Sequence, residues 1–400
     1  MKTILPNQNV LGKNFNPPAR PNLQRAFDLC AAKTRENIKR LADEPKTAAI
    51  AVDGNYFSWK EGFYEIGNWT SSFFTGMALL AWQETEDEFY LNQVLRLAPH
   101  YREKVFKYYV DTMHDLGFLY SLYSVALYKL THDKEHREVG LRAAEVLAGR
   151  FIPSVPDGGY IRAWGRMDEQ DTEYAGLAII DCMMNLPLLY WAAKESGNKR
   201  YSDIAICHAN TTLKCFVRAD DSVFHSYRFD LKTGKPAHSD NYCGRSIESQ
   251  WARGTAWAIY GFALSYSYTR DAKYLETSLR LARKFVAKLD EEAVPIWDFK
   301  LAAGEKPVRD SSAAAVAACG IQELAKHHVA DASLLIAKEA LLDRLCSNDY
   351  LDSNMQCPGI LKNGQIGDGV GVAKNAYTSW GDYYLMEAVT RELFEAEIWW

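Results

Sequence analysis

One carboxylate lies inside an apolar stretch of the sequence. Asp181 belongs to AIIDCMMNLPLLYW, residues 178–191, where isoleucines precede it and methionines follow it. Burying an ionised carboxylate is costly unless the group is paired or takes up a proton. Asn185, four residues later, shares its face of the predicted helix, and Pro187 favours a kink there. Asp181 is therefore either a buried hydrogen-bonding residue or an acid–base catalyst, and the local pattern favours neither.

A second group of polar residues precedes another apolar helix. In YYVDTMHDLGFLYSLY, residues 108–123, Asp111 and Asp115 lie on either side of His114. Asp115 is placed to cap the helix that follows, which is a common structural role for aspartate. No HxxxH pattern or cysteine pair accompanies His114. We therefore expect a hydrogen-bonded structural histidine there and no metal site.

An arginine and two tryptophans mark further apolar helices. Arg253 lies four residues before Trp257, and a guanidinium in such a helix needs a carboxylate or an anionic ligand as its partner. Trp257, on the same face, would offer a flat surface for stacking. Trp69 precedes residues 70–72 at another helix start, which suits either the core or the rim of a cleft. The chain lacks GxSxG, P-loop, GxGxxG and zinc patterns, so carboxylates are the expected acid and base.

Helical periodicity recurs along almost the whole chain after residue 20. Segments with few charges, such as 253–269 and 311–327, alternate with amphipathic charged segments such as 134–149 and 272–289. Two concentric rings of six inner and six outer helices require this alternation, so we predict an all-α fold, the (α/α)6 barrel. An α-solenoid is the alternative, but no regular repeat supports it. The predicted helices are 20–43, 71–86, 88–108, 118–132, 134–149, 175–195, 197–217, 253–269, 272–289, 311–327, 332–347 and 378–395.

The chain shows no linker rich in Pro, Gly or Ser. We therefore predict a single catalytic domain, residues 20–400, that follows an N-terminal extension, residues 1–19. Three segments, 154–165, 222–245 and 292–310, are expected to form loops or short strands at one rim of the barrel.

The composition excludes some partners. A net charge of −5 argues against nucleic acid and anionic membranes, and no apolar run reaches the ~18 residues of a membrane span. Aromatic residues make up 13% of the chain, which is typical of sugar-binding proteins and equally of a large core. The eight cysteines form no CxxC pair, so we expect free thiols, either buried or in a reducing compartment. The N-terminus shows no apolar h-region of a signal peptide, which leaves open whether one has been removed, and we expect a cytoplasmic or periplasmic protein, monomeric or weakly dimeric.

These residues lie in motifs that resemble the unsaturated glucuronyl hydrolases, glycoside hydrolase family 88. The similarity covers most of residues 50–390 in the order of the family. Members of the family are single (α/α)6 barrels, which the helix pattern also predicts. The motifs are NWTSSFFTGM with Trp69, MHDLGFLY with Asp115, IIDCMMNLPLLYWA with Asp181, HSYRFDLKTG with His225, WARGTAWAIYGF with Arg253 and Trp257, VPIWDFK followed by RDSSAAAVAACGIQEL, and WGDYYLMEA.

The resemblance implies removal of a 4,5-unsaturated uronic acid from the non-reducing end of polysaccharide-lyase products, by hydration of the C4=C5 vinyl ether. Asp181 matches the general acid/base, and Asp115 matches the second carboxylate, which holds sugar hydroxyls and stabilises charge in the ring. An acid that is protonated near working pH needs a raised pKa, which apolar surroundings and a second carboxylate both favour. We expect an unsaturated oligosaccharide as the partner and no cofactor. Substrate contacts are implied for Trp69, Trp164, His225, Ser239, Asn241, Arg253 and Trp257.

Departures from the family pattern leave the substrate preference open. Cys243-Gly244 stands where a Gln-Gly pair is expected, and Thr255 stands where Gln is common. Lys374 either contacts a sulfate or the next sugar, or is a solvated loop lysine. The second role is the more common one for such a residue.

Glycosaminoglycan disaccharides are the expected substrates, with three alternatives. An unsaturated rhamnogalacturonyl hydrolase acting on pectin fragments has the same barrel and the same hydration, but the aspartate of MHDLGF favours the glucuronyl group. A non-catalytic sugar-binding barrel would keep the aromatic cleft. A helical scaffold is the third alternative, and the 11 tryptophans speak against it.

Overall fold

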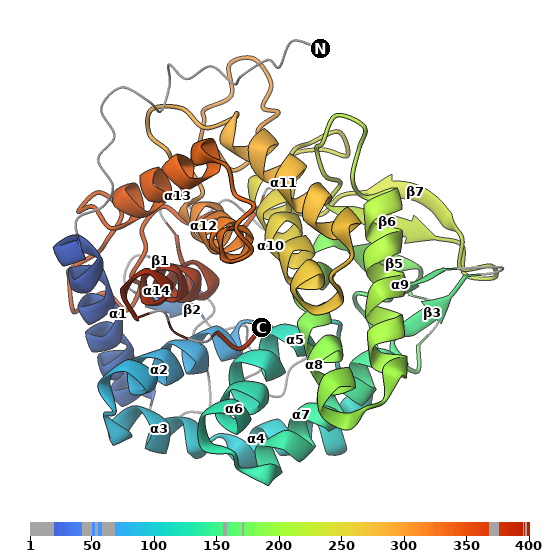
Figure 1. Cartoon of the computed structure of the whole chain (residues 1–400), viewed down its shortest axis with the longest axis horizontal. Helices are drawn as coiled ribbons and strands as arrows, with labels where there is room; N and C mark the ends of the chain where they lie inside the picture. Colours follow the sequence, from blue (N-terminus) through green and yellow to red (C-terminus); the bar gives the residue numbers. More distant parts are fainter. Residues whose placement is uncertain are drawn as a thin grey trace.

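The computed structural model describes residues 20–41, 50–52, 55–57, 69–154, 158–169, 172–367, 376–394, 396 and 398–400. The predicted N-terminal extension, residues 1–19, and Lys374 lie outside the described residues. Viewed as in Figure 1, one set of helices surrounds a central axis and a second set covers it from outside.

The inner set closes on itself. Its members are α2 (Ser71–Thr85), α5 (Leu116–Tyr120) with its continuation through the π-helix η3 (Ser121–Val125) and α6 (Ala126–Thr131), α8 (Leu186–Ser196), α10 (Ala252–Thr269), α12 (Ser311–Lys326) and α14 (Ser379–Phe394). In this order each helix packs against the next, and α14 packs against α2. The outer set comprises α1 (Arg20–Leu41), α3 (Glu88–Leu95), α4 (Ala98–Phe106), α7 (Lys134–Gly149), α9 (Lys199–Cys215), α11 (Ala272–Val286) and α13 (Ala332–Leu345).

Burial separates the two rings as their sequences predict. Every residue of α10 from Ala252 to Ser265 is buried, and so is every residue of α12 from Ser311 to Leu324. The outer helix α11 buries a single face, residues Tyr274, Thr277, Ser278, Leu281, Ala282 and Phe285. Helices with few charges can be surrounded by protein, whereas an amphipathic helix must leave one face in water. The predicted (α/α)6 barrel is confirmed.

Three predicted helices differ from the observed ones. The segment 88–108 divides into α3 and α4, and the segment 118–132 contains the π-turn of η3. The prediction for 175–195 is wrong in its first half, where strand β5 (Leu177–Ile179) and the 3₁₀ turn η4 (Ile180–Met184) precede α8. Pro187 therefore lies in the first turn of α8, where its missing N–H has no helical acceptor to lose, and it causes no kink.

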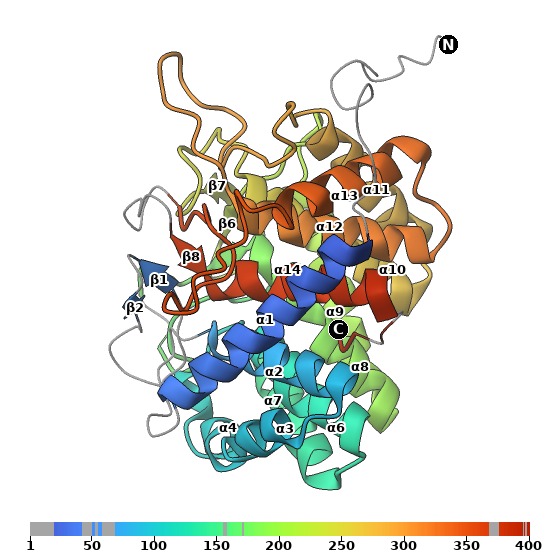
Figure 2. The same cartoon turned by 90° about the vertical axis from the view of Figure 1, so that its left-hand side faces the viewer.

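Short strands gather on one side of the barrel, as Figure 2 shows for the labelled β1, β2, β6, β7 and β8. The strands besides β5 are β1 (Ile50–Val52), β2 (Asn55–Phe57), β3 (Phe151–Pro153), β4 (Gly159–Ile161), β6 (Ser226–Phe229), β7 (Pro236–Asp240) and β8 (Tyr377–Thr378). They form the antiparallel sheets β2-β1-β8, β3-β4 and β5-β6-β7. The predicted rim segments therefore do contain short strands, and 292–310 adds the isolated bridges Trp251–Asp298 and Ile296–Arg309.

A layer of aromatic rings crosses the barrel axis below this rim. Trp400 enters it from the end away from the labelled strands (Figures 1 and 2), and its ring stacks on Tyr384 with centroids 5.9 Å apart. The Trp400 indole N–H donates to Glu387 Oε2 at 2.8 Å. Phe118 and Trp257 complete the layer, and both are 0% exposed. The layer joins α5, α10, α14 and the C-terminal segment.

All eight cysteines are free thiols, as predicted. None of the described helices is long and apolar enough to cross a membrane.

Candidate active site

Four of the predicted site residues lie where the inner helices begin. Trp69 precedes α2, Asp115 is at the N-cap of α5, Asp181 lies in η4 just before α8, and Arg253 is the second residue of α10. Asp310 caps α12, and Trp380 lies in the first turn of α14. Contacts described below join these ends, so one site draws on every inner helix.

Asp181 lies at the end of β5, where the backbone turns into η4. Its Oδ2 is buried and has no hydrogen-bond partner among the described residues, although the whole side chain is 13% exposed. His225 Nε2 lies 3.9 Å from this oxygen. Burial raises the pKa of Asp181 to about 6, against the opposing positive charge of Arg253. The structure therefore gives the predicted acid an unsatisfied, partly accessible carboxyl group.

His225 is held in one tautomer by the backbone. Its Nδ1 accepts hydrogen bonds from Tyr242 N at 2.9 Å and Cys243 N at 3.1 Å. A neutral imidazole that accepts at Nδ1 carries its proton on Nε2, the nitrogen that faces Asp181. Burial lowers the pKa of His225 to about 3, so the ring stays neutral. His225 is thus a fixed N–H donor beside the carboxyl group.

Asp115 occupies the predicted N-cap position but does not cap. Its side chain makes no capping hydrogen bond, and its Oδ1 lies 3.5 Å from His114 Nε2. Burial raises the pKa of Asp115 to about 8, and the negative charge of Asp181 adds to the rise. Since each charge disfavours the other, the two carboxyl groups titrate as a pair that keeps one proton near neutral pH.

Asn185 connects the segments that carry the two carboxylates. Its Oδ1 accepts from Phe118 N at 2.8 Å, in place of an Asp115 cap, and its Nδ2 donates to Asp181 O at 3.3 Å. A Cβ at Gly117 would lie 2.2 Å from Asn185 Cα, so only glycine allows this approach. The residue that the pattern placed on the face of Asp181 therefore sets the spacing between the two aspartates.

Arg253 already has a protein partner. Its Nη1 donates to Asp310 Oδ2 at 2.9 Å, and both side chains are at most 3% exposed. Its guanidinium lies between two indole rings, 4.6 Å from the centroid of Trp251 and 5.1 Å from that of Trp380. Of the two partners expected from the sequence, the structure supplies the carboxylate. A contact between Arg253 and substrate stays a prediction.

The predicted tryptophans have different environments. Trp69 is half-buried and stacks on Trp380 with centroids 4.9 Å apart, so it extends the stack around Arg253. Trp164 is half-buried and packs edge-on against Tyr174 and Tyr242. Trp257 belongs to the fully buried aromatic layer and presents no free face for stacking. It supports the floor of the site, and its direct contact with a sugar stays a prediction.

Asn241 shapes the loop that positions His225. Its Nδ2 donates to Gly244 O at 2.5 Å and its Oδ1 accepts from Gly244 N at 2.9 Å. This tight loop presents the N–H groups of Tyr242 and Cys243 to His225. Ser239 lies half-buried in β7, opposite Tyr227. Substrate contacts of Ser239 and Asn241 stay predictions.

Trp251, Trp380 and Asp310 were missed as site residues by the sequence reasoning. The tryptophans begin the WARG and WGDYY motifs, but an indole next to apolar residues suits a core equally well. Asp310 carried a readable signal, because Asp followed by Ser-Ser at the start of an apolar helix is an N-cap pattern. Nothing local could show that its other oxygen binds Arg253.

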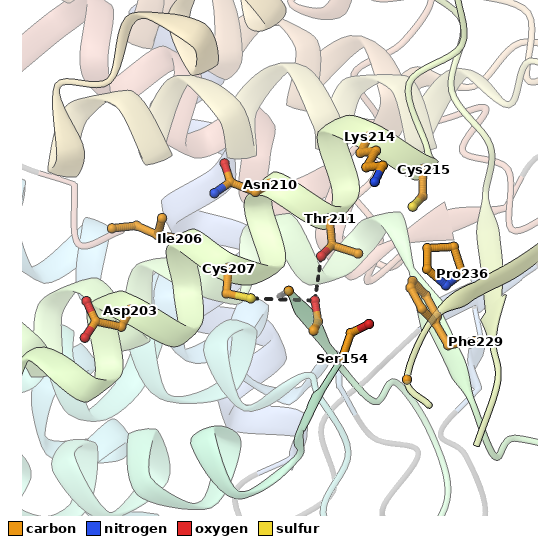
Figure 3. A pocket seen from close by; sticks show the side chains of 13 residues that line it. Ser154, Asp203, Ile206, Cys207, Asn210, Thr211, Lys214, Cys215, Phe229 and Pro236 are labelled. Carbon is orange, nitrogen blue, oxygen red and sulfur yellow. Dashed lines mark hydrogen bonds between the residues drawn. The ribbon is translucent and has the colours of Figure 1, made fainter. Parts of the chain in front are cut away.

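The outer surface carries a pocket that is separate from these site residues. It measures about 440 Å³ and lies between α9 and the strands β4, β6 and β7 (Figure 3). Thr211 and Cys207 both point to the carbonyl oxygen of Gly159 at its base. None of the predicted site residues lines it. Among the described residues, no group of three or more His, Cys, Asp or Glu side chains is arranged to hold a metal ion.

Comparison with known proteins agrees with this geometry. The sequence profile of Glycosyl Hydrolase Family 88 matches residues 39–393. An unsaturated glucuronyl hydrolase from Bacillus sp. (strain GL1) is 36% identical over 377 residues, which are 92% of this chain and 96% of that protein. An unsaturated chondroitin disaccharide hydrolase from Streptococcus pyogenes serotype M1 is 32% identical over 375 residues, 92% of this chain and 91% of that protein.

Solved structures share the barrel. The crystal structure of unsaturated glucuronyl hydrolase from Streptococcus agalactiae has a TM-score of 0.87 with this chain at 29% identity, covering 97% of this chain and 96% of that one. A mutant of that enzyme complexed with dGlcA-GalNAc6S has a TM-score of 0.80 at 27% identity, covering 97% and 95%. The profile, the relatives and the common fold show that this chain belongs to glycoside hydrolase family 88 and is a glycosidase.

Proposed function

We propose that this protein removes the 4,5-unsaturated uronic acid from the non-reducing end of glycosaminoglycan disaccharides, with Asp181 as the general acid/base. The relatives named unsaturated glucuronyl hydrolase and unsaturated chondroitin disaccharide hydrolase support the substrate class. The observation that carries the assignment of residues is the buried pair Asp115 and Asp181. Both carboxyl groups have raised pKa values, and one of them faces a fixed neutral histidine.

The reaction needs one carboxylic acid that donates a proton and one ionised carboxylate that stabilises positive charge. Protonated Asp181 gives its proton to C4 of the vinyl ether, and the positive charge that develops at C5 and the ring oxygen is stabilised by ionised Asp115. The Asp181 carboxylate then takes a proton from a water molecule as the water oxygen bonds to C5. The resulting hemiketal opens, C1 becomes a hemiacetal, and that hemiacetal releases the second sugar and leaves an aldehyde at C1.

Substrate binding would place the single proton of the pair where the reaction needs it. In the free protein the higher pKa belongs to Asp115, so the proton resides there. The uronate carboxylate of the substrate raises the pKa of Asp181, and sugar hydroxyls that donate to Asp115 lower the pKa of that group. Both effects move the proton to Asp181. The N-terminal ends of the inner helices, which carry partial positive charge, favour the uronate at this rim.

His225 suits an accessory part in this scheme. Its Nε2–H faces Asp181, so it can stabilise the carboxylate that remains after proton transfer. The neutral ring adds no charge that would drive the proton from Asp181 beforehand. Trp69 and Trp164, both half-buried, are the aromatic surfaces proposed to contact sugar rings.

A panel of unsaturated disaccharides tests the proposal. Purified protein is incubated with disaccharides from hyaluronan, chondroitin and heparin, sulfated and unsulfated, and with the unsaturated rhamnogalacturonan product. Loss of the ultraviolet absorbance of the C4=C5 bond measures turnover. We expect the glucuronyl disaccharides to react faster, and faster turnover of the pectin product would overturn the choice of substrate.

Two carboxamide variants test the roles within the site. Asp181→Asn and Asp115→Asn should each lower kcat by about 10² to 10⁴-fold, the usual contribution of an acid–base group. Asp111→Asn is the matched control, because Asp111 lies in the same segment but is part-exposed and paired with Arg166. It should keep near-normal turnover. Near-normal turnover by Asp181→Asn would refute the assignment of the acid.

A further inference from the structure

A buried arginine next to the carboxylate pair has no role in the scheme above. Arg150 ends α7 and is 3% exposed. All of its nitrogen atoms donate to backbone carbonyls. The acceptors are Arg162 O at 2.9 Å, Thr112 O at 2.5 Å, Ala163 O at 3.2 Å, Trp164 O at 3.1 Å and Gly165 O at 3.0 Å. So many convergent carbonyls mark a built site for one guanidinium.

These carbonyls belong to two segments that contribute to the active site. Thr112 lies three residues before Asp115, and residues 162–165 include Trp164. His114 N donates to Ala163 O at 3.0 Å, so the same carbonyl receives both the backbone of the Asp115 segment and Arg150. Arg150 therefore fastens the Asp115 segment to the loop that presents Trp164.

The charge of Arg150 is uncompensated. Among the described residues, no carboxylate lies within ion-pair distance of its guanidinium, whereas Arg253 binds Asp310 at 2.9 Å. A buried cation without a counterion is unfavourable unless a nearby group can take the opposite charge. The carboxyl group on which Arg150 acts is Asp115.

We propose that Arg150 is a positioning residue that fixes the Asp115 segment and supplies the positive charge that allows Asp115 to ionise while Asp181 holds the proton. The proposal rests on the proposed function, since only that reaction requires this distribution of one proton. It assigns different jobs to the two arginines. Arg253 is neutralised by Asp310 and acts on Asp181, whereas Arg150 is left unpaired and acts on Asp115.

The electrostatic surroundings of Asp115 agree with this division. The charged and titratable groups that act on it are Asp181 from η4, Arg150 from the end of α7, Lys104 from α4 and the neighbouring His114. Burial and Asp181 raise the pKa of Asp115, and Arg150 and Lys104 lower it. Burial lowers the pKa of Arg150 to about 9, which still leaves the guanidinium charged near neutral pH.

Three variants separate the charge of Arg150 from its hydrogen bonds. Arg150→Gln removes the charge, and Arg150→Lys keeps it but loses most of the carbonyl contacts. Arg162→Gln is the matched control. Arg162 donates to Trp164 O and Glu169 O in the same loop, but it is not among the charges that act most strongly on Asp115. Thermal unfolding of each variant reports whether the fold is kept.

Arg150→Gln should raise the alkaline limb of the kcat/KM profile by about one pH unit, because Asp115 loses its favourable neighbour. The same change lowers the equilibrium constant for moving the proton from Asp115 to Asp181 about tenfold, so the maximal rate should fall about tenfold. Arg150→Lys should restore the wild-type limb, and Arg162→Gln should leave the limb unmoved. If the alkaline limb of Arg150→Gln stayed at its wild-type position, as expected for Arg162→Gln, the proposal would be overturned, whatever the loss of activity.

A titration without substrate keeps this test independent of turnover. The carboxyl ¹³C resonance of Asp115, identified by its loss in Asp115→Asn, is followed with pH in the wild-type protein and in both Arg150 variants. Its pKa should rise by about one unit in Arg150→Gln and return towards wild type in Arg150→Lys. No difference between the variants would refute the charge role. Failure of wild-type protein to turn over any disaccharide would instead refute the proposed function.

Discussion

Changing the pH changes the number of protons on the Asp115–Asp181 pair, and the structure indicates where each proton leaves. Asp181 loses its proton at about pH 6, and Asp115, next to the charge that this creates, loses its proton at about pH 8. The proposed reaction requires one proton on the pair. Below pH 6 both groups are neutral, so Asp115 cannot stabilise positive charge. Above pH 8 neither group can donate.

The expected kcat/KM profile is therefore a bell centred near pH 7. With limbs at about 6 and about 8, the singly protonated fraction is about 80% at pH 7 and about 10% at pH 5 and at pH 9. Activity should thus fall roughly eight- to tenfold over two pH units on each side. The assay is the loss of C4=C5 absorbance at substrate concentrations well below KM, in buffers of constant ionic strength.

An isosteric substitution tests the assignment of the acid limb. Asp310→Asn keeps an oxygen that can cap α12 but removes the negative charge that faces Arg253. The stronger field of Arg253 lowers the pKa of Asp181, so the acid limb should move to lower pH by about 0.5–1 unit while the alkaline limb stays. A profile that is flat between pH 5 and pH 7, or an acid limb that moves to higher pH in this variant, would refute the reasoning.

Two further substitutions test how the barrel supports the site. Gly117→Ala places a Cβ 2.2 Å from Asn185 Cα, so the two aspartate segments must separate; we expect about 2–3 kcal/mol less stability in urea and a large loss of kcat. Arg391→Met leaves Glu323 and Glu387, which are 2% and 0% exposed, without their shared cation; unfolding should become easier by about 3–5 kcal/mol. Turnover per folded molecule should change little in Arg391→Met, and a selective loss of kcat would show that this network also acts on the site.

The ring of helices was predictable because the pattern of charged and apolar residues in each helix indicates how far that helix is buried. The uncharged run that follows Arg253 in α10 and the one-sided pattern of α11 distinguish inner from outer helices without knowledge of the neighbours. The segment before α8 was not predictable in the same way. A short apolar run such as residues 177–184 suits a buried strand as well as a buried helix, and here pairing of β5 with β6 decides the outcome.

The two carboxylates were predictable as candidates, but their relation to each other was not. Asp181 was conspicuous because it is a charge among apolar residues, and Asp115 because it opens an apolar helix. Their separation depends on the Asn185 bond to Phe118 N, which joins residues 67 apart in the chain. Asp310 and Trp380, which contact Arg253, likewise come from segments far from it in sequence. Such tertiary contacts have no local pattern.

The aromatic layer around Trp400 limits the directions from which a substrate of the proposed reaction can approach. Phe118, Trp257 and Tyr384 are fully buried, and their rings pack on one another and on Trp400, so they leave no space between them for a sugar ring. In the proposed reaction the saccharide would therefore have to enter from the side on which the inner helices begin. Both products would have to leave by that same side, so product departure and substrate entry would compete for one route.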